Sequence, residues 1–466
     1  MRVARLAAVL LAMSALVITA ADARAAIENR CIPQLNLTSG WCGDGGPATQ
    51  ALMWWPQSVE TLPDGSFLFN DSDVGLSVVR RVAADGTITR EAGTGTPGFK
   101  GDGGPAKRAR FGGSLSLAAL PGGGYLVADT ENNRVRRVDR SGIVQTVAGT
   151  GRGAFSGDGR RATAAALNGP RAVASTADGG YLIADTFNYR VRKVDRAGII
   201  TTVAGTGRPG SRGDGGPASL ARLGTINDIE ALPDSGYAVV TNSRLRRVSP
   251  TGIISTVATA ETQDFTYLAG LPDGSFRVTA AGNQILGISP GGTTTVVAGM
   301  GDCGYSGDGG PALSARLALP QDLAPLPDGG LLVADGPNSR IRQVSATGII
   351  TTVAGGGGIS RPEVPNPSCG ASPEYGGING FEIAGARAHR RGVRVSFFLT
   401  LRARVRAVLK RGRRVVARRR ARSIVAGRRS LAVRRRLRAG RYRVHLTASR
   451  NGVGSARDSK LVRVGR

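Results

Sequence analysis

The chain has 466 residues, enough for two or three domains, with 62 Lys and Arg against 33 Asp and Glu. The excess charge is confined to one end: residues 387–466 contain 26 Arg, 2 Lys and one acid, whereas residues 1–386 hold 34 basic and 32 acidic residues, a net charge of +2. Both histidines, His389 and His445, lie in the basic end. This excludes a Ser-His-Asp triad and a histidine-ligated zinc site in residues 1–386.

The first 25 residues have the pattern of a secretory signal peptide. A basic start (residues 1–5) is followed by an apolar run (residues 6–21) and by the small-x-small sequence Ala23-Arg24-Ala25. The run is shorter than the roughly 20 residues that cross a bilayer, which argues against the alternative, a retained anchor. We therefore predict a secreted protein, extracellular or associated with the cell envelope, with no transmembrane segment.

A repeat of short strands organises residues 26–356. Residues 124–151 read GYLVADTENNRVRRVDRSGIVQTVAGTG, and residues 180–207 read GYLIADTFNYRVRKVDRAGIITTVAGTG. The apolar stretches of one unit predict strands at residues 115–120, 125–128, 134–138 and 143–148. Four antiparallel strands joined by tight Asp-Gly or Gly-Gly turns are typical of one β-propeller blade.

Anchoring glycines give the number of blades. One glycine precedes the second strand of each unit, at Gly65, Gly124, Gly180, Gly236, Gly274 and Gly330, which predicts an all-β, six-bladed propeller. An insertion of the type Gly-Asp-Gly-Gly-Pro-Ala lies between most units, at residues 101–106, 157–162, 213–218 and 307–312. A further copy, residues 43–48, precedes the first unit, and none follows the last. We therefore expect the ring to close between residues 43 and 355.

Three sequence elements carry a resemblance to a known family. They are the Ala-Asp-Thr-x-Asn-x-Arg-Val/Ile-Arg-x-Val signature, the Thr-Val-Ala-Gly-Thr-Gly strand and the Gly-Asp-Gly-Gly-Pro-Ala loop. Together they resemble the NHL-repeat family, in particular the teneurin-type version of exported bacterial proteins, over roughly residues 40–356. Blade 4 departs from the signature at Thr241, and residues 278–284 of blade 5 keep neither its Asp nor its Arg.

A second, smaller domain is predicted after a Pro/Gly-rich linker, residues 357–385. Residues 386–466 alternate apolar and Arg positions, as at Arg402, Arg404 and Arg406, and contain Gly turns. This pattern predicts a small antiparallel β-sandwich, similar to immunoglobulin-like domains of exported bacterial proteins but without the Cys…Trp…Cys core of antibody domains.

An even number of cysteines in an exported chain predicts two disulfides, formed by Cys31, Cys42, Cys303 and Cys369. Cys31 and Cys42 flank the predicted ring junction, and Cys369 follows the last blade. We favour the pairs Cys31–Cys42 and Cys303–Cys369, and Cys42–Cys369 is the competing pair.

The propeller loops supply the candidate binding residues, and no catalytic residue is predicted. The pairs Asp129/Arg134, Asp185/Arg190 and Asp335/Arg340 recur in register, so we interpret them as charge-assisted pairs that lock neighbouring blades. Loops after second strands and connections after fourth strands emerge on one face, which is the expected ligand platform. The candidate residues there are Asp129, Asn132, Asn133, Asp185, Asn188, Asp335 and Asn338.

Metal and cofactor signals are few. Asn70, Asp71 and Asp73 gather oxygen ligands in one loop and are the candidates for Ca²⁺, although the loop lacks the length and closing Glu of an EF-hand. Two G-x-G-x-x-G matches, beginning at Gly93 and Gly205, have no βαβ context, so we predict no dinucleotide and no other cofactor.

Two functions compete. The leading hypothesis is an exported, non-enzymatic binding or scaffold protein that holds a protein or glycan ligand on the propeller face. The alternative is a lactonase- or lyase-like enzyme with a metal in the central channel, where the first strands offer Glu60, Asp228, Glu230 and Asp322 as acids.

The Arg-rich end predicts attraction to an anionic cell-envelope polymer, weakened by salt, and a basic spacer without a partner is the other interpretation. Nucleic acid is not the expected partner of an exported chain. Because residues 1–386 are almost neutral, we expect a chain ending near residue 357 not to bind an anionic surface.

Overall fold

The computed structural model describes residues 43–73, 76–241, 243–260 and 264–356, and the backbone of seven strands between residues 382 and 464. These strands belong to two compact units, β1–β27 and β28–β34. The predicted signal peptide, Cys31, Cys42, Cys369 and residues 357–381 lie outside the described residues. Among the described residues, no helix has the length and apolar character needed to cross a membrane.

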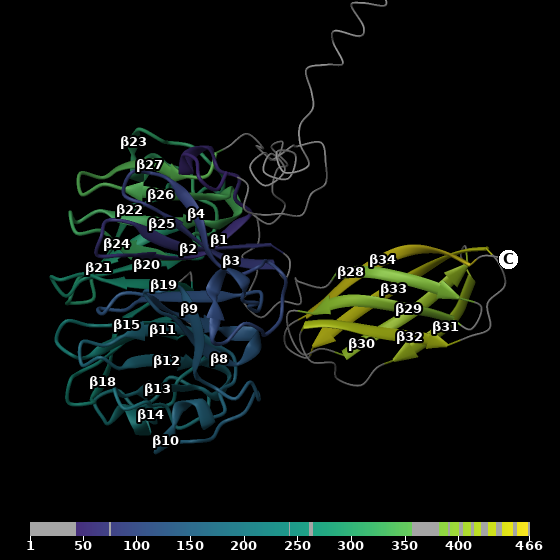
Figure 1. Ribbon diagram of the computed structural model, residues 1–466, viewed down its shortest axis with the longest axis horizontal. Helices are drawn as coiled ribbons and strands as arrows, with labels where there is room; N and C mark the ends of the chain where they lie inside the picture. Colours follow the sequence, from purple (N-terminus) through teal and green to yellow (C-terminus); the bar gives the residue numbers. More distant parts are fainter. Residues whose placement is uncertain are drawn as a thin grey trace, which may run out of the picture. The chain divides into compact units, whose positions relative to one another are not determined.

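The first unit is a six-bladed β-propeller of antiparallel sheets (Figure 1), which confirms the predicted fold class. Blades 1–3 consist of β1 (Trp55–Thr61), β2 (Phe67–Asp73), β3 (Leu76–Val82) and β4 (Ile88–Ala92); β6 (Leu115–Ala119), β7 (Tyr125–Asp129), β8 (Arg134–Val138) and β9 (Ile143–Ala148); and β11 (Pro170–Ser175), β12 (Tyr181–Asp185), β13 (Arg190–Val194) and β14 (Ile199–Ala204). Blades 4–6 consist of β15 (Ile226–Ala231), β16 (Tyr237–Thr241), β17 (Arg244–Val248) and β18 (Ile254–Thr259); β19 (Phe265–Gly270), β20 (Phe276–Ala280), β21 (Gln284–Ile288) and β22 (Thr294–Ala298); and β24 (Leu323–Pro325), β25 (Leu331–Asp335), β26 (Arg340–Val344) and β27 (Ile349–Ala354).

The hydrophobic core lies between the blades. Every residue of the second strands β7, β12, β16 and β25 is buried, because each of these strands packs against neighbouring blades on both faces. One cluster, for example, joins Leu182 and Ala184 of blade 3 to Ile229 and Val239 of blade 4. The apolar runs that predicted these strands are therefore the contacts that hold the ring together.

The insertions extend the blades outward. The short strands β5 (Gly104–Pro105), β10 (Arg160–Arg161) and β23 (Gly310–Pro311) pair with the fourth strand of the blade that follows them in the chain. Single bridges, Pro47 to Thr87 and Pro217 to Ile253, make the same connection in blades 1 and 4. A 3-10 turn follows each copy: η1 (Ala48–Gln50), η2 (Ala106–Arg108), η4 (Ala162–Ala164), η6 (Ala218–Leu220) and η7 (Ala312–Ser314).

The N-terminal copy closes the ring, as predicted. The N–H of Gly45 donates to the carbonyl of Ile88 at 2.7 Å, which attaches this copy to the outer strand of blade 1. The N–H of Gly355, directly after the last strand of blade 6, donates to the carbonyl of Ala48 at 2.9 Å. Segments from opposite ends of the propeller sequence thus share one junction.

The second unit contains two antiparallel sheets, ordered β28-β29-β32 and β31-β30-β33-β34. Its strands are β28 (Glu382–His389), β29 (Gly392–Leu399), β30 (Arg404–Arg411), β31 (Arg414–Arg420), β32 (Gly427–Arg434), β33 (Gly440–Arg450) and β34 (Gly454–Val464). The assignment of this unit as immunoglobulin-like remains a prediction.

Candidate functional site

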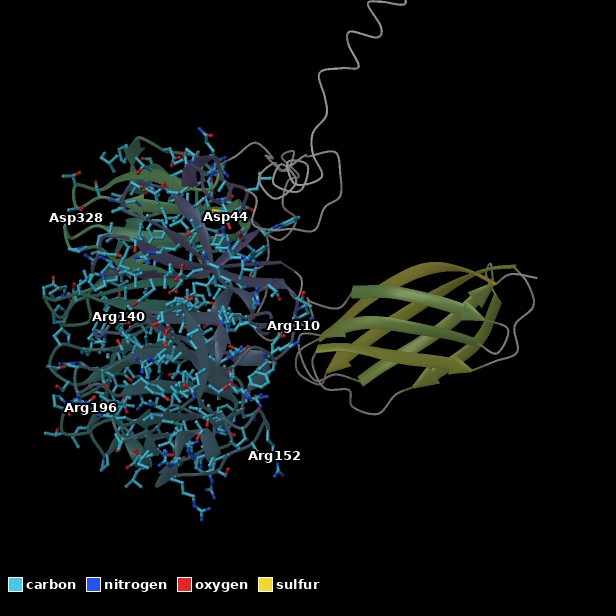
Figure 2. The ribbon with its side chains drawn as sticks, in the orientation of Figure 1. Asp44, Arg110, Arg140, Arg152, Arg196 and Asp328 are labelled. Carbon is cyan, nitrogen blue, oxygen red and sulfur yellow. The ribbon has the colours of Figure 1, made fainter. Side chains whose placement is uncertain are left out.

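The two faces of the propeller are formed by different kinds of loop. Hairpin turns within blades form one face, where Figure 2 places Arg140, Arg196 and Asp328. The opposite face carries Arg110 and Arg152 (Figure 2), which lie in connections between blades. We call this second face, together with the insertions that run from it along the outer edge of the blades to the turns between third and fourth strands, the insertion rim. It comprises residues 43–54, 93–114, 149–169, 205–225, 264 and 299–322, with the loops at residues 130–133, 186–189 and 336–339.

Loops and connections do meet on the insertion rim, as predicted. The Asn132 side-chain amide donates to the carbonyl of Gly98 at 2.9 Å, across the gap between a strand loop and a connection. Asn188 and Asn338 repeat this bond, to Ala154 at 2.9 Å and to Gly304 at 2.7 Å. These three asparagines therefore hold the strand loops against the connections between blades.

The three signature aspartates are fully buried beneath the rim. Asp129 accepts hydrogen bonds from the Gly112 N–H at 2.7 Å and from the Asn132 amide at 2.9 Å. Asp185 and Asp335 make the equivalent bonds. Burial raises the pKa of Asp129 and of Asp335 to about 6, and it also raises the pKa of Asp185. A ligand on the rim would meet the loops that these carboxyls hold, because the carboxyls themselves are covered.

The predicted Asp/Arg pairing is wrong about the arginine. The carboxylate of Asp129 lies 3.9 Å from Arg136, Asp185 lies 3.3 Å from Arg192, and Asp335 lies 3.9 Å from Arg342. The predicted arginine partners, Arg134, Arg190 and Arg340, instead donate hydrogen bonds to backbone carbonyls of the rim. Arg134 donates to the carbonyls of Asn132 at 3.0 Å and Thr150 at 2.8 Å, and Arg190 and Arg340 donate to Asn188 and Asn338. Arg134 and Arg136 lie on the same face of β8, so sequence spacing could not distinguish them.

Sequence reasoning missed the strongest charge pairs of the propeller. Five arginines of the third strands have no exposed surface, and each pairs with the aspartate of an insertion: Arg80 with Asp44, Arg136 with Asp102, Arg192 with Asp158, Arg246 with Asp214 and Arg342 with Asp308. A signal existed, because blade 5 lacks the insertion and has Leu286 where the arginine would stand. Insertion and arginine occur together, as partners would.

The remaining predicted residues also make internal contacts. Asn133 adopts a left-handed backbone conformation (φ 51°). Its side-chain oxygen accepts a hydrogen bond from the Gly169 N–H at 2.8 Å. The side-chain amide oxygen of Asn70 accepts a hydrogen bond from the Ser77 hydroxyl at 2.7 Å. Asp71 pairs with Arg80 at 3.3 Å and is the blade 1 counterpart of Asp129, with a pKa raised by burial to about 6. The Asp73 side chain lies outside the described residues, so the Ca²⁺ candidate remains a prediction.

Four acids come together around the central axis, where the first strands β1, β6, β11, β15, β19 and β24 contact one another in a ring. They are Glu60, Asp228, Glu230 and Asp322, all of them partly exposed. Burial raises the pKa of Glu60 and of Asp322 to about 7. Burial and neighbouring acids raise the pKa of Asp228 and Glu230 well above its ordinary range.

Three of these acids join neighbouring blades. Asp228 accepts the Leu268 N–H of blade 5 at 2.9 Å, Asp322 accepts the Val59 N–H of blade 1 at 3.0 Å, and Glu60 accepts the Ala119 N–H of blade 2 at 2.9 Å. Within the described residues, no three Asp, Glu, Cys or His side chains are arranged to hold a metal ion. The enzyme alternative therefore gains no specific support from these acids.

Exposed aromatic side chains are concentrated on the insertion rim. The five exposed aromatics of the described residues are Trp54, Phe99, Phe155, Phe187 and Tyr305, and all five lie in its connections or loops. Three of them form a repeated pair with a guanidinium: Arg134 stacks on Phe99, Arg190 on Phe155 and Arg340 on Tyr305, each 3.8 Å from the ring centre.

Comparison with known proteins agrees with this architecture. No family model matches the chain. Teneurin-1 of Homo sapiens is 27% identical over 355 residues, covering 64% of this chain and 12% of the relative. Teneurin-3 of Mus musculus is 29% identical over 339 residues, covering 60% of this chain and 12% of the relative. The chain thus spans only a small part of these relatives.

Similar solved structures include a protein of unknown function from Bacteroides thetaiotaomicron, with TM-score 0.46 and 17% identity over 66% of this chain and 72% of that one. A streptogramin B lyase structure has a TM-score of 0.43 and 13% sequence identity, over 68% of this chain and 84% of that one. At these values the likeness identifies neither ligand nor activity. The blades and their closure define a six-bladed β-propeller protein. With the sequence signature and the teneurin similarity, its propeller is of the NHL type.

Proposed function

We propose that the propeller is a non-enzymatic recognition platform that binds a protein or glycan ligand on the insertion rim. The observation that carries this proposal is the location of every exposed aromatic side chain of the described residues on that one face. Aromatic and arginine side chains are enriched in binding interfaces, because they bury large areas and lose little conformational freedom. Internal hydrogen bonds hold the rim loops, so a ligand would meet a preformed surface.

The proposal includes export and envelope association. The signal-peptide pattern of residues 1–25 and the even number of cysteines support a secreted protein. The 28 basic residues among positions 387–466 support attraction of the C-terminal unit to an anionic envelope polymer. The proposal needs no metal. Metal analysis of the untreated, purified protein checks this point, and a stoichiometric divalent ion would favour the enzyme alternative.

Matched variants of the full chain test the platform on arrays of extracellular proteins and glycans. Phe187→Ser with Tyr305→Ser removes two exposed aromatics from the insertion rim. Val296→Ser removes an exposed apolar side chain from β22, in the blade that lacks the insertion. We expect the first variant to lose the array ligands of the wild type and the second to keep them. Equal binding by both variants would contradict the proposal.

A further inference from the structure

The insertion rim is electrostatically uneven, although residues 1–386 are almost neutral overall. The successive connections into blades 2, 3 and 4 contain ten Lys and Arg and three Asp. The connections into blades 5, 6 and 1, counted as residue 264, residues 299–321 and residues 43–54, contain one Arg and four acids. We call the first three connections, residues 93–114, 149–169 and 205–225, the basic arc.

The three acids of the basic arc are already neutralised. Asp102, Asp158 and Asp214 pair with the buried arginines of the third strands, which are not among the ten cations. All ten cations are exposed, and no ion pair of theirs is found within the described residues: Lys100, Lys107, Arg108, Arg110, Arg152, Arg160, Arg161, Arg208, Arg212 and Arg222. The arc therefore presents positive charge to solvent, and Glu131, whose carboxylate lies against Gly113 of the first connection, is the exposed acid of the adjoining loops.

Side-chain contacts make the basic arc continuous. Arg134 stacks on Phe99 of the first connection and donates to the Thr150 carbonyl of the second at 2.8 Å. Arg190 stacks on Phe155 of the second connection and donates to the Thr206 carbonyl of the third at 2.9 Å. The rings remain 43% and 40% exposed. Each step along the arc thus combines one apolar ring surface with unpaired cations.

We propose that the basic arc binds an acidic polysaccharide, a proposal that rests on the recognition platform proposed above and names its ligand class. A polymer of charged sugars presents, in each unit, an anionic group and an apolar C–H ring face. The repeat of the propeller presents the complementary groups, a cation for the anion and an aromatic ring for the sugar face. An acidic peptide would match the charges but would leave the exposed rings without a regular partner.

The faces of the propeller offer a matched pair of variants. Arg110 and Arg152 belong to the basic arc, whereas Arg140 and Arg196 lie on the opposite face (Figure 2). All four side chains are exposed, and none has an ion pair within the described residues. Replacing either pair by Ser removes two charges and leaves the basic C-terminal unit unchanged, so a difference between the variants reports on the rim.

The test is hydrogen exchange of the full chain with and without alginate oligosaccharide, a polyuronate, because this readout separates the rim from the basic end. We expect slower exchange in the basic arc and no change in residues 299–322. Arg110→Ser with Arg152→Ser should raise the alginate concentration needed for this protection about two- to tenfold. Arg140→Ser with Arg196→Ser should leave that concentration unchanged, and melting temperatures verify that each variant is folded.

A second comparison tests the role of the rings. Phe99→Leu with Phe155→Leu should weaken protection by alginate, whereas weak protection by polyglutamate, which has charge but no sugar ring, should stay the same. Protection by polyglutamate or by single-stranded oligo-dT equal to that by alginate would overturn the proposal in favour of a peptide or a nucleic acid. Protection confined to residues 387–466 would overturn it in favour of the basic end alone.

The outcomes also separate this proposal from the recognition platform. If alginate, or a ligand found on the arrays, protects residues 299–322 and not the basic arc, the platform stands and the polysaccharide site is wrong. If neither alginate nor any array ligand protects a segment of the insertion rim, both are wrong.

Discussion

Each fully buried arginine of the third strands donates to an acid and to at least one backbone carbonyl. Arg136 donates to Asp102 at 2.7 Å, to the Arg110 carbonyl at 2.9 Å and to the Lys100 carbonyl at 3.1 Å. A buried charge is costly unless it is paired and hydrogen-bonded in this way. The arginine therefore ties the insertion to its blade, together with the buried Ala106 of the insertion.

Arg136→Ala should lower the free energy of unfolding by about 3 kcal/mol, because it removes one partner of a buried pair and leaves a cavity. Arg137→Ala is the matched control, since this neighbouring side chain is exposed. Its effect should stay below about 0.5 kcal/mol. Chemical denaturation of both variants measures the difference, and equal effects would contradict the assigned role of Arg136.

The acids around the central axis give the propeller a pH dependence of definite sign. In the folded state Glu60 and Asp322 keep their protons up to a pH of about 7, whereas in the unfolded state they lose them near a pH of about 4. Between these values the folded state binds more protons, so its stability falls as the pH rises.

Glu230→Gln should raise the melting temperature at pH 8 by about 1–3 °C, because the amide removes a charge that burial and three nearby acids disfavour. At pH 4.5 both side chains are neutral, and the variant should melt with the wild type. Differential scanning calorimetry at the two pH values provides the measurement. A lower melting temperature of the variant at pH 8 would show that the charged carboxylate is stabilising.

At the scale of the element, glycine sets the path of the rim arginines. Gly151 has a φ of +87°, and a Cβ placed on it would lie 2.1 Å from the guanidinium of Arg134. Arg134 therefore crosses directly over Gly151 on its way to Phe99 and Thr150. Gly159, in the same connection, has a φ of +77° and open space around its Cβ position.

Gly151→Ala should destabilise the protein by about 1 kcal/mol more than Gly159→Ala. Both variants place Ala at positive φ, so this strain cancels in the comparison, and the difference reports the displacement of Arg134. Denaturation curves of the two variants give the value. Identical curves would mean that the guanidinium moves aside without loss.

Regular strands were predictable from sequence, whereas side-chain partners were not. Residues 134–138 and 143–148 form strands as expected, because apolar alternation fixes which residues face the core. The first strand of blade 1, which begins at Trp55, contains a bulge between Pro56 and Ser58 that apolar alternation does not predict. The choice of Arg136 over Arg134 for Asp129 depends on how an insertion docks, which local pattern does not encode.

At the scale of the whole molecule, the net charge of the propeller conceals an uneven distribution. The near-neutral total of residues 1–386 gives the expectation that the propeller alone does not bind an anionic surface, whereas the proposed polysaccharide site rests on the basic arc, whose charge that total averages with the more acidic connections. The closed ring keeps these regions apart, because each connection stays beside its own blade. The location of the basic arc follows from the position of each charged residue in the repeat, and not from the total composition.

We predict that two disulfides tie the propeller to segments outside its described residues. No cysteine among the described residues is free, and Cys303 lies in the connection between blades 5 and 6. We predict the pairs Cys303–Cys369 and Cys31–Cys42. Peptide mapping of the non-reduced protein should yield these two linked pairs. A linked Cys42–Cys369 peptide would establish the competing connectivity, and four alkylated thiols would contradict both.

Closure of the ring by the N-terminal copy predicts that the propeller unfolds as one unit that depends on residues 43–48. Deleting Cys42 with these residues removes the Gly355–Ala48 and Gly45–Ile88 hydrogen bonds and leaves the buried Arg80 without Asp44. Blades 6 and 1 then lose their shared junction, so the melting temperature should fall by at least about 5 °C. Alanine at Thr49 and Gln50, exposed residues of the same segment, should leave the melting temperature unchanged. If the deletion melts with the wild type, the apolar contacts between blades 6 and 1 suffice to close the ring on their own.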